Sequence, residues 1–432
     1  MIKELLIQDV RCFQGEHRAR LSPITLLVGE NSTGKTTFLG CYSVLHRLIS
    51  RSALASAPID FNMEPFSMGS FREIVRSTRG RAGRIDHFKL GFTITPMPGS
   101  RVRSYPILVT FSERGSQPVV TSIHIQFKEG VYLNIRRNSS GDTTLETPER
   151  KATLDYSVDN WMYLLDYLFR PDEHLGESED VRGITESLTR LLSGTKSPAG
   201  WRLWLPDIPQ VAPLAPLRSK PKRTYDPVRE AASPSGEHVP MLMMRLDRTE
   251  KDDWSSLRDG LVEFGGYSGL FSDIKIRGHG RQMSDPFQVQ VKVRSGTFAN
   301  IMDVGYGVSQ SLPILVDVRR AKRHTFLLQQ PEVHLHPRAQ AGLAVLFAQA
   351  WKQNRNRFLI ETHSDHIVDR IRILVRNGDL TTDDVAILYF ESNRNSVVIH
   401  NIGIDADGNL QNVPAGYRQF FLEETDQLLG FA

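Results

Sequence analysis

The sequence predicts an α/β fold assembled from the two ends of the chain, with a β-rich lobe and a helical or irregular insertion between them. A strand, a glycine-containing loop and a helix occupy residues 23–49, and short alternating apolar runs fill residues 88–156. Helices alternate with strands from residue 301 onward. We therefore expect three segments, residues 1–155, residues 156–300 and residues 301–432.

The composition is that of a folded protein in a reducing compartment. With 432 residues, 40% of them hydrophobic, the chain can bury a substantial core without disulfide bonds. Only Cys12 and Cys41 occur, which favours the cytoplasm and argues against a cysteine-based metal site. Neither a signal-peptide pattern nor a run of about 18 apolar residues is present. We expect a protein that is neither exported nor membrane-spanning, and the net charge of +4 points to no class of partner.

The segment GENSTGKT, residues 29–36, fits the pattern G-x-x-x-x-G-K-[ST]. It lies between the strand PITLLVGE and the helical pattern TTFLGCYSVLHRLI, a context that disfavours the alternative of a chance glycine turn. Backbone N–H groups at the helix start offer an anion site, Lys35 is expected to reach the β- and γ-phosphates, and Thr36 is expected to bind Mg²⁺. The candidate ATP-binding residues are Asn31, Ser32, Thr33, Gly34, Lys35, Thr36 and Thr37.

The middle of the chain changes pattern twice. The runs FKLGFTIT, YPILVTF, VVTSIHIQF and VYLNIRR alternate as in an antiparallel sheet. WMYLLDYLF and ITESLTRLLSG follow as helices. The proline-rich stretch WLPDIPQVAPLAPLRSKPKRTYDP is expected to be an ordered connector, because apolar residues recur through it.

A glycine-rich helix start, VGYGVSQSLPIL, covers residues 304–315. Ser309 is expected to cap this helix while the N–H groups of the helix start face an anion. A plain N-cap is the alternative. A serine-bearing helix start followed by a strand with a polar end is the order found in ABC-type ATPases, where the signature serine contacts the γ-phosphate bound by the opposite subunit. This order favours a functional serine.

The strand TFLLQ delivers Gln329 and Gln330 where ABC-type enzymes place the magnesium acid and the catalytic glutamate. A neutral amide can ligate Mg²⁺ weakly or hold a water, but it cannot act as a general base near neutral pH. Glu332 is the nearest carboxylate and is expected to reach the water or the metal. His363, at the end of the strand RFLIET, is expected to complete the γ-phosphate shell. Slow ATP hydrolysis follows from this set.

Two other polar pairs invite a metal assignment. His334 and His336 flank one leucine, have no cysteine companions and precede Pro337 at a helix start, so structural or dimer-contact roles are expected. Asp405 and Asp407 lie in DADG, which is typical of a turn between strands. We expect no metal other than Mg²⁺.

The segments GENSTGKTT, YGVSQSLPIL, QQPEVHLHP and ETHSDHI, in this order, resemble bacterial ABC/SMC-like ATPases related to the ATPase half of OLD (overcoming lysogenization defect) nucleases. The resemblance implies an ABC-type P-loop head with a β lobe, with Walker A in the first segment and signature, Walker B and switch histidine in the last. It implies a homodimer or higher homo-oligomer formed around ATP. Similar proteins include the ATPase components of the antiphage systems PARIS and Septu, which act with a separately encoded effector.

OLD proteins carry a TOPRIM-type nuclease domain after the ATPase, and only about 70 residues follow the histidine strand here. We therefore expect any nuclease, or a toxin in its place, to be a separate chain. The leading hypothesis is an ATP-dimerised sensor or scaffold in antiphage defence. The alternatives are a DNA-repair or DNA-maintenance ATPase acting directly on DNA, and a regulator without turnover. The lack of heptads for coiled-coil arms favours the first hypothesis.

Basic residues gather in three places. Each group is expected to be a solvated loop, with contact to nucleic-acid phosphates as the alternative, so DNA or a phage protein is a candidate trigger. The groups are Arg76, Arg79, Arg81 and Arg84; Arg218, Lys220, Lys222 and Arg223; and Arg319, Arg320, Lys322 and Arg323. Gly69-Ser70-Phe71 lies near the position of an ABC Q-loop but lacks its glutamine, and Arg11 and Phe13 are expected on the adenine side.

Overall fold

A computed structural model describes most of the chain. The described residues are 2–49, 59–77, 85–95, 104–138, 141–154, 179–193, 209–227, 231–280, 282, 284–293, 296–394 and 396–417. They form two compact units that are interleaved along the chain. The first comprises Met1–Leu21, Ser32–Ile208 and Phe390–Ile399, and the second comprises Ser22–Asn31, Pro209–Tyr389 and His400–Ala432. The three ranges expected from the sequence are therefore consecutive segments of the chain and not its compact units.

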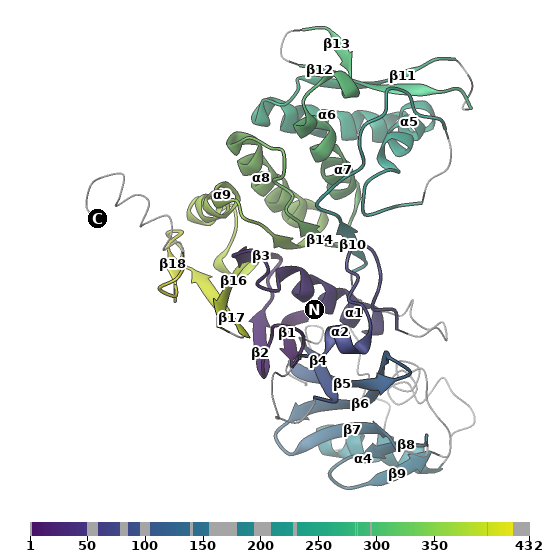
Figure 1. Cartoon of the computed structure of the whole chain (residues 1–432), viewed down its shortest axis with the longest axis vertical. Helices are drawn as coiled ribbons and strands as arrows, with labels where there is room; N and C mark the ends of the chain where they lie inside the picture. Colours follow the sequence, from purple (N-terminus) through teal and green to yellow (C-terminus); the bar gives the residue numbers. More distant parts are fainter. Residues whose placement is uncertain are drawn as a thin grey trace. The chain divides into compact units, whose positions relative to one another are not determined.

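The first unit contains the antiparallel β lobe that the alternating runs predict (Figure 1). Its eight strands follow the order β2-β1-β4-β5-β6-β7-β8-β9. Their bounds are β1 Ile2–Gln8, β2 Glu16–Arg20, β4 His87–Ile94, β5 Tyr105–Arg114, β6 Gln117–Lys128, β7 Val131–Arg137, β8 Thr143–Glu146 and β9 Lys151–Leu154. Buried and half-buried residues alternate along β5 and β7, so one face of the sheet is covered.

Aromatic packing holds the covered face together. Phe88 and Phe111 are cross-strand partners whose rings stack at 5.0 Å, and Phe61 meets both rings edge-on. The described residues of this unit include the helices α1 Lys35–Ile49, α2 Phe71–Ile74 and α4 Glu179–Ser193. The expected helix WMYLLDYLF lies outside the described residues, whereas ITESLTRLLSG falls within α4.

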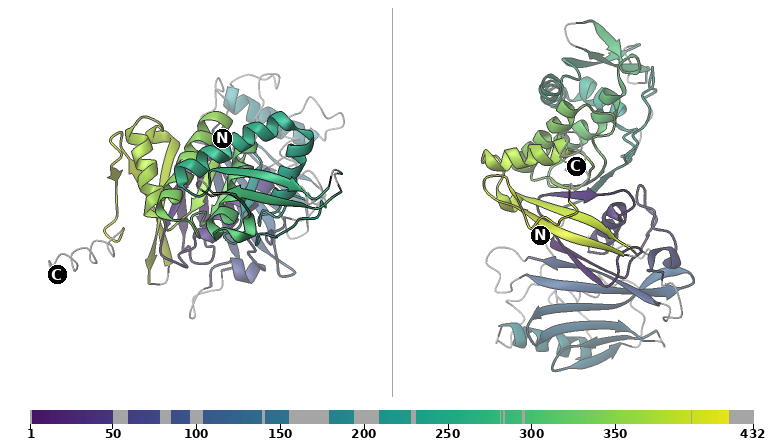
Figure 2. Two further views of the ribbon diagram at one scale, coloured as in Figure 1. Left: turned by 90° about the horizontal axis from the view of Figure 1, so that it is seen from above. Right: turned by 60° about the vertical axis from the view of Figure 1, so that its left-hand side comes forward.

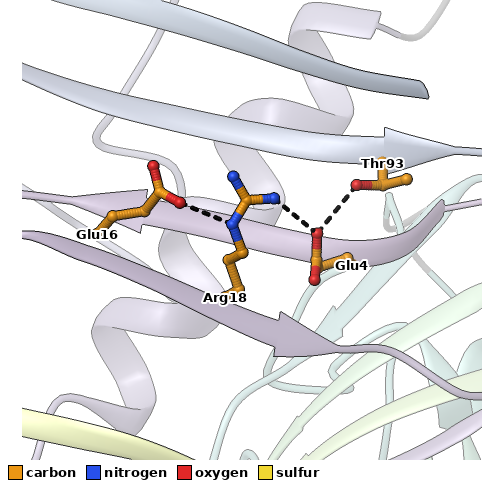
Figure 3. Close-up of polar contacts among 4 residues, drawn as sticks. All are labelled: Glu4, Glu16, Arg18 and Thr93. Atoms are coloured by element: carbon orange, nitrogen blue, oxygen red, sulfur yellow. Dashed lines mark hydrogen bonds and ion pairs between the residues drawn. The ribbon is translucent and has the colours of Figure 1, made fainter. Parts of the chain in front are cut away.

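Polar side chains join strands β1, β2 and β4 on the outer face of the lobe (Figure 3). Arg18 pairs with Glu16 at 2.6 Å and with Glu4 at 3.4 Å, and the Thr93 hydroxyl donates to Glu4 at 3.0 Å. Glu4 and Thr93 are also register partners. Because these side chains are partly exposed, each ion pair contributes only about 0–1 kcal/mol, and the apolar face determines the stability of the lobe.

The second unit is built on a sheet with the order β10-β14-β15-β3-β16-β17-β18. The bounds are β10 Val211–Leu214, β14 Thr325–Gln329, β15 Arg357–Glu361, β3 Ile24–Gly29, β16 Val385–Asn393, β17 Ser396–Ile404 and β18 Leu410–Gln411. The first four of these strands are parallel to one another. The described part of the proline-rich connector is therefore not only a connector, because it supplies β10 as an edge strand, where Pro213 is tolerated.

The register of the parallel strands is supported by buried aromatic side chains. Phe326 of β14 lies opposite Phe358 of β15, with the two rings stacked at 5.6 Å. Phe347 of α8 packs on Phe358 at 4.8 Å. A one-residue slip of either strand would turn these rings to the other face of the sheet, so their burial favours a single register.

Helices and a small sheet complete the second unit (Figure 2). The helices are α5 Val239–Thr249, α6 Lys251–Ser268, α7 Tyr306–Arg320, α8 Pro337–Asn354 and α9 Asp365–Arg376, with the 3₁₀ turns η4 Ile301–Asp303 and η5 Thr382–Asp384. The sheet is antiparallel, with the order β11 Asp273–Gly278, β12 Phe287–Lys292 and β13 Phe298–Asn300. The helical and irregular insertion predicted for residues 156–300 thus also contains a sheet. Within the described ranges, no helix is long and apolar enough to cross a membrane.

Candidate functional site

The phosphate loop has the strand, loop and helix context that its motif requires. Strand β3 ends at Gly29, and α1 begins at Lys35. Gly34 has φ +87°, and a Cβ at this position would lie 2.5 Å from the Cys12 sulfur, so glycine is required there. Lys35 is 3% exposed, whereas Thr36 is exposed. A helix start that follows a glycine-containing loop is the context in which backbone N–H groups bind phosphate in other proteins.

Arg11 secures the start of α1 inside the first unit. Its guanidinium donates to the Thr37 hydroxyl at 3.2 Å, to the Met68 carbonyl at 2.9 Å and to the Glu73 carbonyl at 3.2 Å. Phe13 is fully buried against Phe390, with ring centroids 6.2 Å apart. The expectation that Phe13 approaches an adenine is therefore wrong, because its ring is part of the core.

The carboxyl ends of the parallel strands bring three polar segments of the second unit to one edge. Gln329 lies opposite Glu361, and Glu361 lies opposite Leu27 of β3, just before the phosphate loop. The Gln330 N–H donates to the Glu361 carbonyl at 2.7 Å. Gln330 has φ +42°, a left-handed conformation that non-glycine residues rarely adopt and that recurs at functional sites. In open α/β sheets this edge is where ligands bind.

Glu361 is a candidate that the pattern analysis missed. It is 7% exposed, and its Cα is the register partner of Gln329, which is 8% exposed. Register partners of a parallel pair project to the same face, so the carboxylate of β15 lies beside the amide that stands at the expected acid position of β14. The signal was present in the sequence, since both strands end in ionisable or amide side chains, but only the pairing relates the two positions.

Glu332 lies in the turn that follows β14. It is 9% exposed, one carboxylate oxygen accepts the backbone N–H of His363 at 2.7 Å, and the other is buried with no hydrogen-bond partner among the described residues. Burial raises the pKa of Glu332 above its ordinary value. Hydrogen bonds with the backbone of His363, with its own backbone and with the Thr362 side chain, together with the nearby charge of Arg218, oppose this rise. A raised pKa makes the carboxylate a stronger proton acceptor than an ordinary glutamate.

Arg218 is buried beside this turn. Its backbone N–H donates to the Gln310 side chain at 3.2 Å, and its guanidinium donates to the Pro216 carbonyl at 3.1 Å and the Pro331 carbonyl at 3.3 Å. Burial lowers the pKa of Arg218 to about 10, although Glu332 favours the charged form. The expectation that Arg218 belongs to a solvated basic loop is therefore wrong. Arg218 instead joins the helix that carries Ser309 to the turn that carries Glu332.

Ser309 does not cap its helix. The N-cap of α7 is Gly305, and the helix begins at Tyr306. The Ser309 hydroxyl donates to the Tyr306 carbonyl at 3.0 Å, the local bond that serine readily forms inside a helix. The glycine-rich entry shifts the helix start by one turn and leaves the serine within the first turn. Tyr306 is 51% exposed at this helix end.

The structure places the three histidines and the two aspartates considered as metal ligands or γ-phosphate contacts. His363 is exposed directly after β15, and His336 is the N-cap residue of α8. The His334 ring lies 5.7 Å from the Tyr306 ring. Asp405 accepts backbone N–H groups from Asp407 at 3.0 Å and from Asn409 at 2.8 Å, which confirms the expected turn. The described residues contain no cluster of three or more histidine, cysteine or acidic residues suited to a metal ion.

The structure describes some residues of the first two basic groups and the segment at the expected Q-loop position. Arg223 forms a two-point ion pair with Asp303 at 2.9 and 2.6 Å, whereas Lys220 and Lys222 are exposed. Of the group at residues 76–84, only Arg76 lies within the described ranges. Ser70 and Glu73 close the first turn of α2 through bonds of 2.7 and 2.8 Å, a structural arrangement.

Comparison with known families gives one match. Residues 245–368 match the model of the AAA ATPase domain, a range that contains Ser309, Gln329, Gln330, Glu332 and His363. No curated protein matches the chain. The matched region and the strand–loop–helix motif of residues 29–36 support an ATPase.

Solved SMC heads are among the similar structures. The Smc head bound to the C-winged helix domain of ScpA has 11% identity, covers 94% of this chain and 98% of its own, and has a TM-score of 0.44. The SMC head of Thermotoga maritima has 11% identity, 94% and 99% coverage and a TM-score of 0.37. The Pyrococcus furiosus Smc head with an extended coiled coil, bound to the C-terminal domain of ScpA, has 11% identity. That match covers 98% of this chain and 99% of its own, with a TM-score of 0.38. Because these identities and TM-scores are low, the partners of the SMC heads are not assigned to this chain.

We predict that Glu332→Gln raises the melting temperature by a few degrees at about pH 8 and much less at about pH 5. A carboxyl whose pKa is raised in the folded state contributes stability at low pH, and this contribution is lost as pH rises through the folded pKa. Glutamine keeps the acceptor for the His363 N–H without the charge. Melting curves of wild type, Glu332→Gln and the exposed control Glu237→Gln measure the effect. A Glu332→Gln protein that melts below wild type at the higher pH contradicts it.

Proposed function

We propose that the chain is an ATP-binding, slowly hydrolysing ABC-type ATPase that dimerises around ATP. The observation that carries the proposal is the buried Glu332 carboxylate in the turn after β14, one oxygen of which has no hydrogen-bond partner among the described residues. It follows the same sheet edge at which β3 leads into the phosphate loop. A buried carboxyl with unused hydrogen-bonding capacity at this edge is typical of a catalytic acid or base.

Magnesium would be held by Thr36 and Gln329. Thr36 is the hydroxyl residue of the phosphate-loop motif, and Gln329 offers a neutral carbonyl oxygen. A neutral ligand neutralises none of the metal's charge, so Mg²⁺ affinity would be low with these two side chains alone. The Glu361 carboxylate on the neighbouring strand supplies the missing negative charge in this proposal.

Hydrolysis would rely on Glu332 as the general base. Gln330 can position the attacking water but cannot accept its proton. The Glu332 carboxylate accepts the backbone N–H of His363, so the proposed base is linked to the main chain of the switch histidine by one hydrogen bond. A histidine that responds to the γ-phosphate would thereby move together with the group that activates the water.

Two chains would close around two ATP molecules, with Ser309 of one chain facing the nucleotide held by Lys35 of the other. The exposed Tyr306 beside Ser309, and the exposed Met302 and Leu217, favour a protein interface in this part of the second unit. The Ser309 backbone N–H and hydroxyl are the phosphate-facing groups of this proposal, and the hydroxyl must leave the Tyr306 carbonyl to reach a phosphate.

The proposed role is that of a sensor or scaffold that controls a separately encoded nuclease or toxin in bacterial antiphage defence. Its support is the order of the four motifs resembling OLD-type and antiphage ATPases. Direct action on DNA is the second candidate. Of the second basic group, Arg218 is buried and Arg223 is paired with Asp303, which reduces the charge available to a DNA backbone. Turnover measured with and without duplex DNA separates the two roles, because a DNA-activated ATPase favours the second.

We predict wild-type turnover well below about 10 s⁻¹, the median for enzymes. Glu332→Gln removes the proposed base and should lower the remaining rate by about 10²–10⁴. Gln330→Glu restores an acid at the usual place and should raise the rate, and Glu237→Gln is the matched exposed control. Steady-state phosphate release measures all four proteins. Brisk wild-type turnover, or a Glu332→Gln variant as fast as wild type, would refute the proposed base.

Ser309→Arg should leave ATP binding by the monomer intact and prevent ATP-dependent dimerisation, because a bulky cation replaces the group that faces the second nucleotide. Lys35→Ala should lose both properties, since it removes the cation of the phosphate loop. Nucleotide titration and sedimentation velocity with and without ATP give the two readouts. ATP-dependent dimers of the Ser309→Arg chain, at the wild-type ATP concentration, would contradict the arrangement.

A further inference from the structure

A polar cavity of about 450 Å³ lies in the second unit, away from the residues assigned above. It is enclosed by α6, the end of α7 and the end of α8, three helices that pack on one another (Figure 1). The cationic and amide side chains that line the cavity are Arg319, Arg320, Lys322, Gln349, Gln353 and Asn354. Arg319 and Ser309 are both on α7, ten residues or about 15 Å apart at 1.5 Å per residue, so the cavity is distinct from the signature end of the helix.

Arg319 is built into the wall of the cavity. A Cβ at Gly260 of α6 would lie 2.3 Å from an Arg319 guanidinium nitrogen, so the glycine admits the side chain against the helix backbone. Glycine inside a helix costs about 1 kcal/mol relative to alanine, and here it makes room for a cation. The Arg319 Nε is buried and has no hydrogen-bond partner among the described residues. Burial lowers the pKa of Arg319, with Glu263 opposing this effect.

The charges around the cavity are unbalanced. Three cations line it against one carboxylate, that of Asp253. Glu263 accepts from Arg319 and from Gln349, each at 3.4 Å, and its side chain is 62% exposed, so both bonds are long and open to solvent. A partly desolvated guanidinium with such a weak counter-charge favours an additional anion.

We propose that this cavity binds a small phosphate-bearing ligand of nucleotide size. Arginine and lysine side chains, with amide groups beside them, are the groups that bind phosphate oxygens. The volume falls within the range of small-molecule sites, about 300–1,000 Å³. A recess of this size favours a small ligand over the backbone of duplex DNA, which binds to exposed basic surfaces.

Inorganic pyrophosphate is the probe for a calorimetric test. The full-length chain with Lys35→Ala removes the contribution of the phosphate loop. In that background, pyrophosphate should bind, and the double charge reversal Arg320→Glu with Lys322→Glu should weaken binding about tenfold or more. Both side chains are exposed. The matched control, Lys220→Glu with Lys222→Glu, makes the same charge change at exposed positions of the same unit and should bind like the parent.

The proposal is overturned if pyrophosphate does not bind the parent, or if the cavity reversal and the control reversal weaken it equally. It is also overturned if duplex DNA, but not pyrophosphate, binds in a manner that the cavity reversal abolishes. Melting curves establish that each variant is folded, and Arg320→Gln with Lys322→Gln replaces the reversal if it is not. None of these readouts depends on ATP turnover, so the cavity and the proposed ATPase mechanism can fail independently.

Discussion

The parallel pairing of β14, β15 and β3 is the constraint on which the candidate site depends. It places Gln329 opposite Glu361 and Glu361 opposite Leu27, so three segments distant in sequence end at one edge. The buried rings of Phe326, Phe358 and Phe347 favour this register, because a slip by one residue would turn the strand side chains to the other face. Packing energy in the core is thus what positions the polar groups at the edge.

Polar groups at this edge carry an electrostatic cost that the core must offset. Within the part of the chain that the structure describes, one buried oxygen of Glu332 and the buried Nε of Arg218 have no hydrogen-bond partner. Burial raises the pKa of Glu332 and lowers the pKa of Arg218, which means that both charged forms are disfavoured by their surroundings. Neither group improves packing, since a neutral side chain of similar size would fill the same space. Such a cost is common where a site is arranged for binding or chemistry rather than for stability.

Local patterns predict much of the fold. The strand and helix on either side of residues 30–34, the strands of the β lobe and the alternating helices and strands after residue 301 are confirmed, because periodicity and loop chemistry act over short distances. The sheet formed by β11, β12 and β13 was missed, since its strands are short and stand among helices. The proline-rich segment was expected to connect elements, yet it pairs with β14 as β10, a tertiary contact that no local pattern reports.

In the candidate site, too, some residues can be predicted from local sequence, whereas others depend on tertiary contacts. Glu332 and His363 can be selected from the sequence because each directly follows an apolar strand, and they are found joined by one hydrogen bond. Glu361 cannot be related to Gln329 without the sheet register, and the burial of Arg218 cannot be inferred from a lysine- and arginine-rich segment. Ser309 was placed one turn too early in its helix, because glycine at position 305 takes the N-cap. Their roles toward ATP remain proposals.

The most direct test of the proposed mechanism is a crystal structure of the chain with Mg²⁺ and a non-hydrolysable ATP analogue. The proposal predicts that the free carboxylate oxygen of Glu332 lies within one water of the γ-phosphate, with Glu361 bound to Mg²⁺ directly or through water. A structure in which the Glu332 carboxylate stays enclosed by protein, with no water between it and the phosphate, would contradict its role as the base.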